Sequence, residues 1–451
     1  MQPFKLSFIA LKKPVLASIC LSLMLLGCGG GGKTSDEVPG NIQPASTSGL
    51  RALPAIFTTS KAVAYSPFVT TNRATETITD SQVLTDLNLI TSAGIGVIRL
   101  FDSSDKVALR TLRVIRANNL NLKVMLGVYV NSFETQSNPI TKLGIQQANE
   151  DEIARGVALA KTYSNEVIAV SVGNETMPSW SVVPISTTTL AQYIKTVRDQ
   201  ITQPVTTDDN WAYYAGLSRN ANDQVNDLLR QIDFASIHSY AYADATYSNF
   251  ADNDPYPDWD WQQKGVTDLS KRATAMMDAA IAKTKQDYNA VRAYLDTMGR
   301  SSMPIIIGET GWKAANSGAS IDALMAHPVN QKMFYARLLD WALESRTNNG
   351  PKGIVYFEAF DEPWKGSDDK WGLFTVDRKA RCAVQALNPS LTADTSTSCA
   401  SSAAVYYTAP TLTAAVSTST LVVHNESTTG WPADMRADPY QIGTFTLDYP
   451  K

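Results

Sequence analysis

Short apolar runs alternate with longer amphipathic segments along most of this 451-residue chain. The short runs are rich in Val, Ile and Leu, as expected of strands buried on both faces, and lie at 62–68, 96–101, 122–130, 167–175, 204–208, 234–240, 304–309 and 353–360. The longer segments carry apolar residues at helical spacing and lie at 81–93, 106–118, 144–163, 188–201, 225–232, 268–296 and 329–346. This alternation predicts a parallel sheet whose consecutive strands are joined by helices.

Eight such units within roughly 330 residues predict an α/β fold of the (β/α)8 type, the TIM barrel. A doubly wound sheet is the alternative. No Gly-rich phosphate-binding fingerprint follows the first predicted strand, which weakens that alternative. Catalytic residues of a (β/α)8 barrel lie at the carboxyl ends of its strands, so functional side chains are expected there.

Two of the predicted strands end in the same way. Residues 304–309 read PIIIGE and residues 167–175 read VIAVSVGNE, so each apolar run leads through Gly to a glutamate. A carboxylate at the end of a buried strand is costly unless another group uses or pairs it. A pair of carboxylates is also what cleavage of a glycosidic bond requires. We therefore predict that Glu175 and Glu309 are catalytic; for either one alone, a solvated loop residue or an ion-pair partner is the ordinary alternative.

The first 27 residues predict a lipoprotein signal peptide. Three lysines precede an apolar stretch at 14–26 that is too short to span a membrane as a helix. The stretch ends in Leu-Leu-Gly-Cys, which resembles the lipobox of bacterial lipoproteins and implies lipid attachment to the thiol of Cys28. Gly29 follows, which favours the outer membrane of a bacterium with two membranes. An ordinary secretory signal is the alternative.

The remaining chain divides by composition. Residues 28–55 predict a flexible tether, residues 56–390 the barrel domain, and residues 391–451 a Ser/Thr-rich carboxyl-terminal extension. With Cys20 in the signal peptide and Cys28 lipidated, Cys382 and Cys399 remain, and we expect them to form a disulfide in an exported protein. Two free thiols are the alternative.

The net charge and the positions of the histidines argue against two kinds of binding site. A net charge of −4 and the lack of a basic cluster argue against nucleic-acid binding. The three histidines, His238, His327 and His424, are too scattered in the sequence to predict a His-based metal site.

Seven motifs at the predicted strand ends resemble glycoside hydrolase family 17, whose members are β-1,3-glucanases and related glucanosyltransferases with a (β/α)8 fold. The motifs are Tyr65-Ser66-Pro67, Ile98-Arg99-Leu100, Gly173-Asn174-Glu175, Val205-Thr206-Thr207, His238-Ser239-Tyr240, Gly308-Glu309-Thr310-Gly311-Trp312 and Phe360-Asp361-Glu362-Pro363-Trp364-Lys365. Asn-Glu after the fourth strand recurs in many retaining glycosidases, whereas the ordered set is specific.

The resemblance implies a role for each matching residue. Glu175 corresponds to the acid/base and Glu309 to the nucleophile of a retaining, double-displacement mechanism. Asn174 is expected to hydrogen-bond the 2-hydroxyl of the sugar. The remaining predicted substrate-binding residues are Tyr65, Arg99, Tyr240, Trp312, Glu362 and Lys365. No metal and no cofactor is expected.

The segment 241–265 is not covered by these motifs. It carries six aromatic residues: Tyr242, Tyr247, Phe250, Tyr256, Trp259 and Trp261. Either they form a sugar-stacking wall over the cleft, or they pin the loop to the barrel. The sequence leaves both readings open.

The predicted function is hydrolysis of β-1,3-glucan by an exported, lipid-anchored, endo-glucanase-like enzyme. A glucanosyltransferase is the alternative within the same chemistry. A non-catalytic glucan-binding lipoprotein is the alternative from another class, and the presence of both Glu175 and Glu309 argues against it. We expect β-glucan as the substrate, contact with a membrane through the anchor alone, no nucleic-acid partner, and a monomer.

Overall fold

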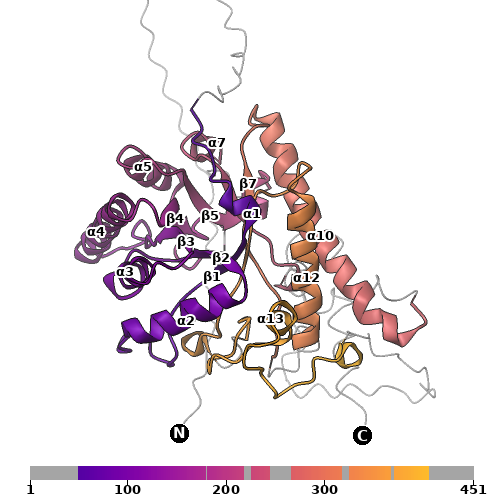
Figure 1. Cartoon of the computed structure of the whole chain (residues 1–451). Helices are drawn as coiled ribbons and strands as arrows, with labels where there is room; N and C mark the ends of the chain where they lie inside the picture. The colour runs from indigo at the N-terminus through magenta and orange to yellow at the C-terminus, as the bar shows by residue number, and fades with distance from the viewer. Residues whose placement is uncertain are drawn as a thin grey trace, which may run out of the picture. The chain divides into compact units, whose positions relative to one another are not determined.

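The computed structural model describes residues 49–178, 180–217, 225–243, 266–316, 325–366 and 370–405. All of them belong to the compact unit formed by Ala45–Lys451. Within this described part, eight parallel strands close into a barrel in sequence order, with the last strand pairing with the first (Figure 1). The strands are β1 (Lys61–Ala64), β2 (Ile95–Arg99), β3 (Lys123–Val128), β4 (Val167–Asn174), β5 (Val205–Asn210), β6 (Ala235–His238), β7 (Ile305–Thr310) and β8 (Ile354–Tyr356). The predicted (β/α)8 barrel is thereby confirmed, and the doubly wound alternative is excluded.

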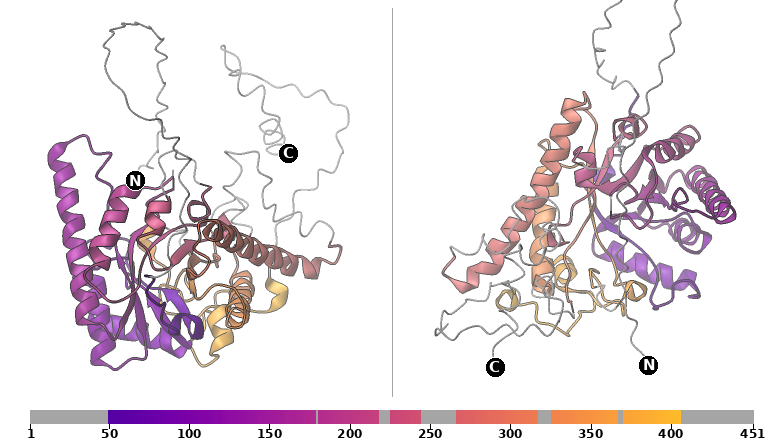
Figure 2. Two further views of the ribbon diagram at one scale, coloured as in Figure 1. Left: turned by 90° about the horizontal axis from the view of Figure 1, so that it is seen from above. Right: turned by 180° about the vertical axis from the view of Figure 1, so that it is seen from behind.

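Helices surround the barrel, with α2 to α5 on one side and α10 and α12 on the other (Figure 2). Their bounds are α1 (Ile56–Thr59), α2 (Asp80–Ser92), α3 (Arg110–Ala117), α4 (Pro139–Thr162), α5 (Thr187–Arg198), α6 (Trp211–Tyr214), α7 (Val225–Leu229), α10 (Leu269–Thr297), α12 (Pro328–Glu344) and α13 (Cys382–Leu387). Several begin where a polar side chain accepts a hydrogen bond from the first turn, as at Thr79, Asn138, Ser186 and Asp268. Such caps satisfy backbone N–H groups that lack a partner within the helix.

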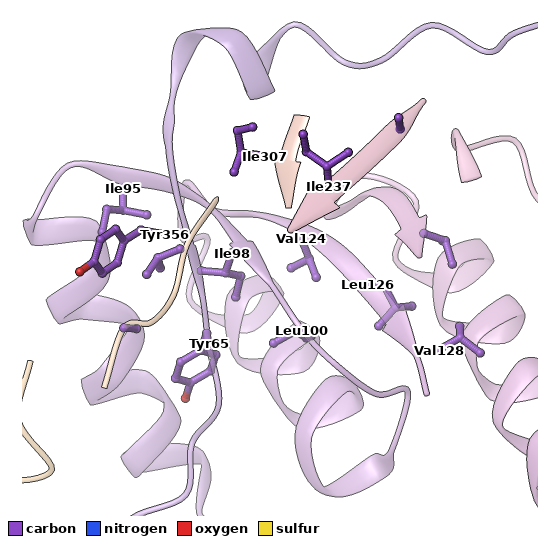
Figure 3. Close-up of a cluster of buried hydrophobic side chains, with 14 of the residues drawn as sticks. Tyr65, Ile95, Ile98, Leu100, Val124, Leu126, Val128, Ile237, Ile307 and Tyr356 are labelled. Atoms are coloured by element: carbon purple, nitrogen blue, oxygen red, sulfur yellow. The ribbon is translucent and has the colours of Figure 1, made fainter. Parts of the chain in front are cut away.

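Alternate residues of each strand face two different apolar layers. On β3, Val124, Leu126 and Val128 face outward and pack with the helices (Figure 3). Met125 lies between them and points into the barrel, where it joins a small cluster that includes Phe57 of α1. Fully burying such side chains stabilises the fold by about 1.5–3 kcal/mol each. This double burial explains why the strands read as continuous apolar runs.

The structure differs from the predicted elements mainly at their ends. The predicted helix 106–118 is divided into a π-helical turn, Asp105–Leu109, and α3. The helix predicted at 144–163 begins earlier, at Pro139, because Asn138 caps it and proline fits a first helical turn. The strand predicted at 353–360 is limited to Ile354–Tyr356. The short helices α1, α6 and α13 carry too few turns to give a periodic signal.

Arg51, which precedes the predicted start of the barrel domain at residue 56, forms hydrogen bonds with the barrel. Arg51 donates hydrogen bonds to the carbonyl oxygens of Gln203 and Arg198, at 2.8 and 2.6 Å, and its backbone N–H donates to Asp233 at 2.9 Å. These contacts fix the last residues of the predicted tether. The signal peptide and Cys28 lie outside the described residues.

The carboxyl-terminal segment returns to the barrel beside the end of β8. Arg381 forms a buried ion pair with Asp361, with Nη1 and Nη2 at 2.7 and 2.6 Å from the two carboxylate oxygens. A disulfide joins Cys382 of α13 to Cys399. The extension beyond residue 405 lies outside the described residues. In the described part of the chain, no helix has both the length and the apolar character needed to cross a membrane.

Candidate active site

Glu309 lies at the carboxyl end of β7 and is 5% exposed. Arg99, at the end of β2, donates from Nη1 to Glu309 Oε1 at 2.5 Å. The Tyr240 hydroxyl donates to the other oxygen, Oε2, at 2.7 Å. Both carboxylate oxygens are therefore held by donors, which fixes the direction in which the carboxylate faces.

Arg99 connects three strand ends through its guanidinium group. Besides Glu309, it donates from Nε to Asp208 Oδ2 at 2.8 Å and from Nη2 to Asn174 Oδ1 at 2.6 Å. The side chain is 1% exposed and lies over the ring of Phe101, 4.6 Å from its centroid. A buried charge is stable only when it is paired and hydrogen-bonded. Arg99 thus holds the ends of β4, β5 and β7 in one electrostatic network.

Glu175 follows β4 directly and has the backbone conformation of a left-handed residue, with φ of 50°. Positive φ is uncommon in residues other than glycine and occurs often at functional sites. The N–H of Glu175 donates to the carbonyl of Asp208 at 2.8 Å. Asp209 Oδ2 accepts from the next two N–H groups, those of Thr176 and Met177, at 3.1 and 3.0 Å. The end of β5 therefore fixes the turn that presents the Glu175 side chain.

His238, at the end of β6, lies between the two glutamates. Its Nδ1 is 2.9 Å from Glu175 Oε1, and its Nε2 is 3.7 Å from Glu309 Oε1. The ring is fully buried, and Nε2 has no hydrogen-bond partner among the described residues. We did not predict His238 as a site residue, although it stands two residues before Tyr240 in one of the matching motifs. Only its position in space shows its relation to both carboxylates.

Glu175, His238 and Glu309 each offer one polar atom, and these three atoms all lie within 4.8 Å of one another. Such a group can hold a metal ion. Arg99 is already paired with Glu309 and supplies positive charge there, so the site has a cation of its own. The same distance also means that the two catalytic carboxylates predicted from the sequence face each other closely.

The environment shifts the proton affinities of these groups in different directions. Burial alone would raise the pKa of Glu309, but the charges of His238 and Arg99 and the hydrogen bonds from Tyr240 and Arg99 outweigh burial and lower it. Burial alone would lower the pKa of His238, and the neighbouring glutamates outweigh that effect and raise it. The lowered pKa keeps Glu309 ionised, and the raised pKa of His238 favours a protonated imidazole beside it.

Asp209 is fully buried, and among the described residues it forms no ion pair with a lysine or arginine. Burial raises the pKa of its carboxyl group to about 7, even though backbone N–H groups donate to it. The charge of Glu175 acts in the same direction. Asp208 and Asp209 were missed in the sequence, where the consecutive acidic residues at the end of the short run 204–208 were the available signal.

A second charged cluster lies at the end of β8. Lys365 Nζ contacts Glu358 Oε2 at 3.0 Å and also pairs with Glu362. Trp364 Nε1 donates to Glu362 Oε1 at 3.0 Å. Burial would raise the pKa of Glu362, but Lys365 outweighs it and lowers it. The structure therefore pairs Lys365 with Glu362 and adds Glu358, which we did not predict; the substrate-binding role of Glu362 and Lys365 stays a prediction.

Two predicted substrate-binding residues are buried beneath the site. Tyr65 is 1% exposed, and its hydroxyl donates to Asp86 Oδ2 at 3.1 Å. Trp312 is fully buried, and its Nε1 donates to the carbonyl of Met325 at 2.9 Å. Both rings pack in the hydrophobic core, and their predicted contact with substrate stays a prediction.

Tyr242 pins the start of segment 241–265 to the barrel. It is buried, and its ring packs edge-on against Trp312 and Trp371, with centroids 5.0 and 5.3 Å apart. The other five aromatic residues of that segment, Tyr247, Phe250, Tyr256, Trp259 and Trp261, lie outside the described residues. Half-buried aromatic side chains do surround the described site at other strand ends: Phe101, Tyr129, Tyr240, Phe357, Trp364 and Trp371.

In sequence and in fold, the chain is similar to known glycoside hydrolases. Residues 62–373 match the family described as the BtgE/BtgC glycoside hydrolase domain. A glucan 1,3-beta-glucosidase of Arthroderma benhamiae is 24% identical over 283 residues, which is 59% of this chain and 72% of the fungal protein. The crystal structure of an endo-laminarinase from Formosa Hel1_33_131 has the same fold, with a TM-score of 0.63 and 23% identity over 74% of this chain and 88% of that one. The family match contains β2 to β8, all of β1 except its first residue, and every residue of the site described above.

Proposed function

The chain belongs to the BtgE/BtgC glycoside hydrolase family and is a glycosidase; on that premise, we propose that it cleaves β-1,3-glucan with retention of anomeric configuration. The observation that carries the mechanism is the closeness of Glu175 and Glu309, whose facing atoms lie within 4.8 Å. Retaining enzymes place their carboxyl groups roughly 5–5.5 Å apart, whereas inverting enzymes need about 6.5–9.5 Å to admit a water molecule.

In the first step, Glu309 acts as the nucleophile. One of its oxygens forms a bond to the anomeric carbon, while the glycosidic oxygen leaves with a proton from Glu175. Arg99 and Tyr240 hold Glu309 ionised and aimed, since each donates to one of its oxygens. The lowered pKa of Glu309 fits this role, because only the carboxylate form can attack.

In the second step, Glu175 acts as the base. It takes a proton from a water molecule, whose oxygen bonds to the anomeric carbon and releases Glu309 as a carboxylate. Glu175 therefore needs to carry a proton in one step and to lack it in the next. His238 Nδ1, 2.9 Å from Glu175 Oε1, can donate a hydrogen bond to that oxygen in both states, because the carbonyl oxygen of a protonated carboxyl group still accepts.

Asn174 is suited to hold the reacting sugar. Its Oδ1 accepts from Arg99 at 2.6 Å, which turns the amide group so that Nδ2 remains as a donor. A hydrogen bond to the 2-hydroxyl of the sugar strengthens as the transition state forms and contributes to the rate. The substrate itself, β-1,3-glucan, is proposed from the name of the Arthroderma benhamiae relative together with the motifs of the site.

The test is to incubate the purified chain with linear β-1,3-gluco-oligosaccharides and follow the products by NMR. We expect cleavage in which the β-anomer of the new reducing end forms first, and Glu309→Gln protein serves as the blank. An α-anomer as the first product would overturn the retaining mechanism, and no cleavage at all would overturn the substrate. Products longer than the substrate at high oligosaccharide concentration would identify the glucanosyltransferase alternative.

We further propose that the chain is exported and anchored to the cell envelope, in the outer membrane, by lipid on Cys28. The support is the sequence Leu25-Leu26-Gly27-Cys28 after a basic and then apolar leader. A single lipid chain gives weak and reversible binding, and two or more give stable anchoring. The anchor would place the glycosidase at a membrane surface without a spanning helix.

A further inference from the structure

We propose that an open groove between the loop after β3 and the loop after β4 binds the leaving-group side of the glucan chain, away from the cleaved bond. The groove has a volume of about 460 Å³, within the range of ligand sites in proteins. This inference rests on the proposed function, because it assigns the groove to the same substrate.

The loop after β4 brings one wall of the groove next to the acid/base. Val182, Val183 and Pro184 line that wall. The following residue, Ile185, donates its N–H to the carbonyl of Thr176 at 3.2 Å, and Thr176 directly follows Glu175. This wall of the groove is therefore joined through Ile185 to the segment that carries Glu175. Because the proposed acid/base protonates the leaving oxygen, the groove is assigned to the sugars beyond that oxygen.

The opposite wall is one face of the first turns of α4. Thr141, Gly144, Ile145 and Ala148 line it at helical spacing of three and four residues. At Gly144 an added Cβ would meet no atom within 4 Å, so this position opens directly onto the groove. The adjacency of α4 and α5, which the two loops precede, is visible in Figure 1.

The two walls are held together by hydrogen bonds, so the groove exists before a ligand arrives. Glu134, on the loop after β3, accepts from the N–H and the hydroxyl of Ser186 at 2.7 and 2.6 Å. It also accepts from the Thr189 hydroxyl at 2.5 Å. Asn149 of α4 exchanges two hydrogen bonds with the backbone of Asn131, at 2.8 and 2.9 Å. A preformed site avoids the cost of ordering loops upon binding.

The chemistry of the lining matches an uncharged sugar chain. The described residues that line the groove include no charged side chain, and the polar ones among them carry amides and hydroxyls: Asn131, Ser132, Thr135, Gln136 and Thr141. Within the described chain, the side chains of Asn131, Gln136 and Thr141 have no protein partner, so they remain available to sugar hydroxyls. An anionic lipid surface or a charged peptide would require basic or acidic residues that this lining lacks.

Two exposed apolar side chains lie on the loop after β4 at this groove. Of the large hydrophobic side chains that are exposed in the described part of the chain, Val182 lines the groove and Trp180 stands two residues before it. Trp180 is 58% exposed. An indole combines a flat apolar face with a polar N–H, as stacking against the face of a sugar ring requires.

The experiment measures kcat/KM for β-1,3-gluco-oligosaccharides of increasing length and locates the cleaved bond with an ¹⁸O label at the reducing end. Gly144→Phe in the full chain adds a ring at a position that lines the groove, where an added Cβ meets no atom within 4 Å. We expect the ratio of kcat/KM between the longest and the shortest cleaved substrate to fall at least fivefold. The cleavage position should also move toward the reducing end. Ala158→Phe, an exposed position at the far end of the same helix, is the control.

Trp180→Ala provides a second variant on the opposite wall, with Leu343→Ala, equally exposed on α12, as its control. A smaller fall in the same ratio is expected. Unchanged ratios and cleavage positions in both groove variants, with wild-type activity intact, would overturn the groove assignment alone. Absence of wild-type activity on β-1,3-glucan would overturn the proposed function and the groove with it. Loss of vesicle binding in Gly144→Phe, with length dependence retained, would assign the groove to a membrane and overturn the proposal.

Discussion

At the scale of single residues, the site is a small set of buried charges that stabilise one another. Arg99 pairs with Glu309 and Asp208, and His238 lies between Glu309 and Glu175. Removing one partner from such a network leaves another charge buried and unpaired, which costs about 3–5 kcal/mol. Conservative, nearly isosteric substitutions therefore separate chemistry from folding better than truncation to alanine does.

Glu309→Gln removes the nucleophile while keeping the shape of the side chain. We expect kcat to fall at least about a thousandfold, because an amide cannot attack the anomeric carbon. The amide oxygen can still accept a hydrogen bond, so circular dichroism should show an intact fold. Glu344→Gln, at an exposed position of α12, is the control. A wild-type rate, once contamination is excluded, would remove Glu309 as the nucleophile.

Tyr240→Phe removes one of the donors to Glu309. Because that hydrogen bond helps to lower the pKa of Glu309, its loss should move the acidic limb of the kcat/KM profile to higher pH. A hydrogen bond to a charged group contributes about 1.5–3 kcal/mol, so kcat/KM should fall roughly ten- to a hundredfold. Tyr288→Phe, whose hydroxyl donates to the Asn349 carbonyl, is the control. An acidic limb at its wild-type position would contradict this role.

Asp209→Asn tests a link between the site and pH-dependent stability. Burial raises the folded-state pKa of Asp209 to about 7. A raised pKa contributes stability that is complete below the unfolded value, about pH 4, and is lost as the pH rises through 7. Asparagine cannot ionise, so this loss disappears in the variant. From pH 4 to 8, the free energy of unfolding of the variant relative to wild type should rise, by up to about 4 kcal/mol.

Urea titrations at several pH values provide this measurement, with Asp340→Asn on the exposed face of α12 as the control. If the difference between Asp209→Asn and wild type is the same at every pH, Asp209 does not titrate as described.

At the scale of elements, the strand ends change from apolar to polar within a few residues. β5 begins with Val205 and ends with Asp208, Asp209 and Asn210. Its polar end is stable because each carboxylate has donors: Arg99 and Ser236 for Asp208, and backbone N–H groups for Asp209. The barrel thus supplies a rigid apolar base and concentrates its polar side chains at one rim.

The disulfide stabilises the carboxyl-terminal element. Cys382 begins α13, and the loop that the disulfide closes has a sequence separation of 17. Cys399→Ala should lower the free energy of unfolding by about 3 kcal/mol, because the unfolded chain regains the entropy of that loop. Urea denaturation measures the loss, with Ser396→Ala as the control. Finding two reactive thiols in unreduced, unfolded wild-type protein would refute the pairing.

At the scale of the whole molecule, the proposed anchor and the barrel have separable tasks. Cys28→Ala should release the protein from membranes while leaving its specific activity unchanged, because the lipid attaches more than 30 residues before β1. Fractionation after a high-salt wash measures the release. A variant that stays with the membranes would place the anchor elsewhere.

The barrel and the position of its two glutamates could be predicted from the amino-acid sequence. Apolar runs of strand length between amphipathic segments permit few architectures, and a parallel barrel places every strand end at the same rim. Glu175 and Glu309 could therefore be assigned to one site without knowing any contact. A short stretch of sequence shows whether a side chain follows the carboxyl end of a strand. In a parallel barrel, that position is enough to place the side chain at the rim where the site lies.

The contacts between these side chains could not be predicted from the sequence, because they depend on the three-dimensional fold. Arg99 and Glu309 are 210 residues apart in the chain, and Glu175 and His238 are 63 apart, so barrel closure and strand register create their contacts. The sequence also could not show which motif residues are buried. Tyr65 and Trp312 both stand in motifs that resemble the family, and the rings of both pack in the core. Rotamers and packing choose between those outcomes, and both depend on neighbours distant in sequence.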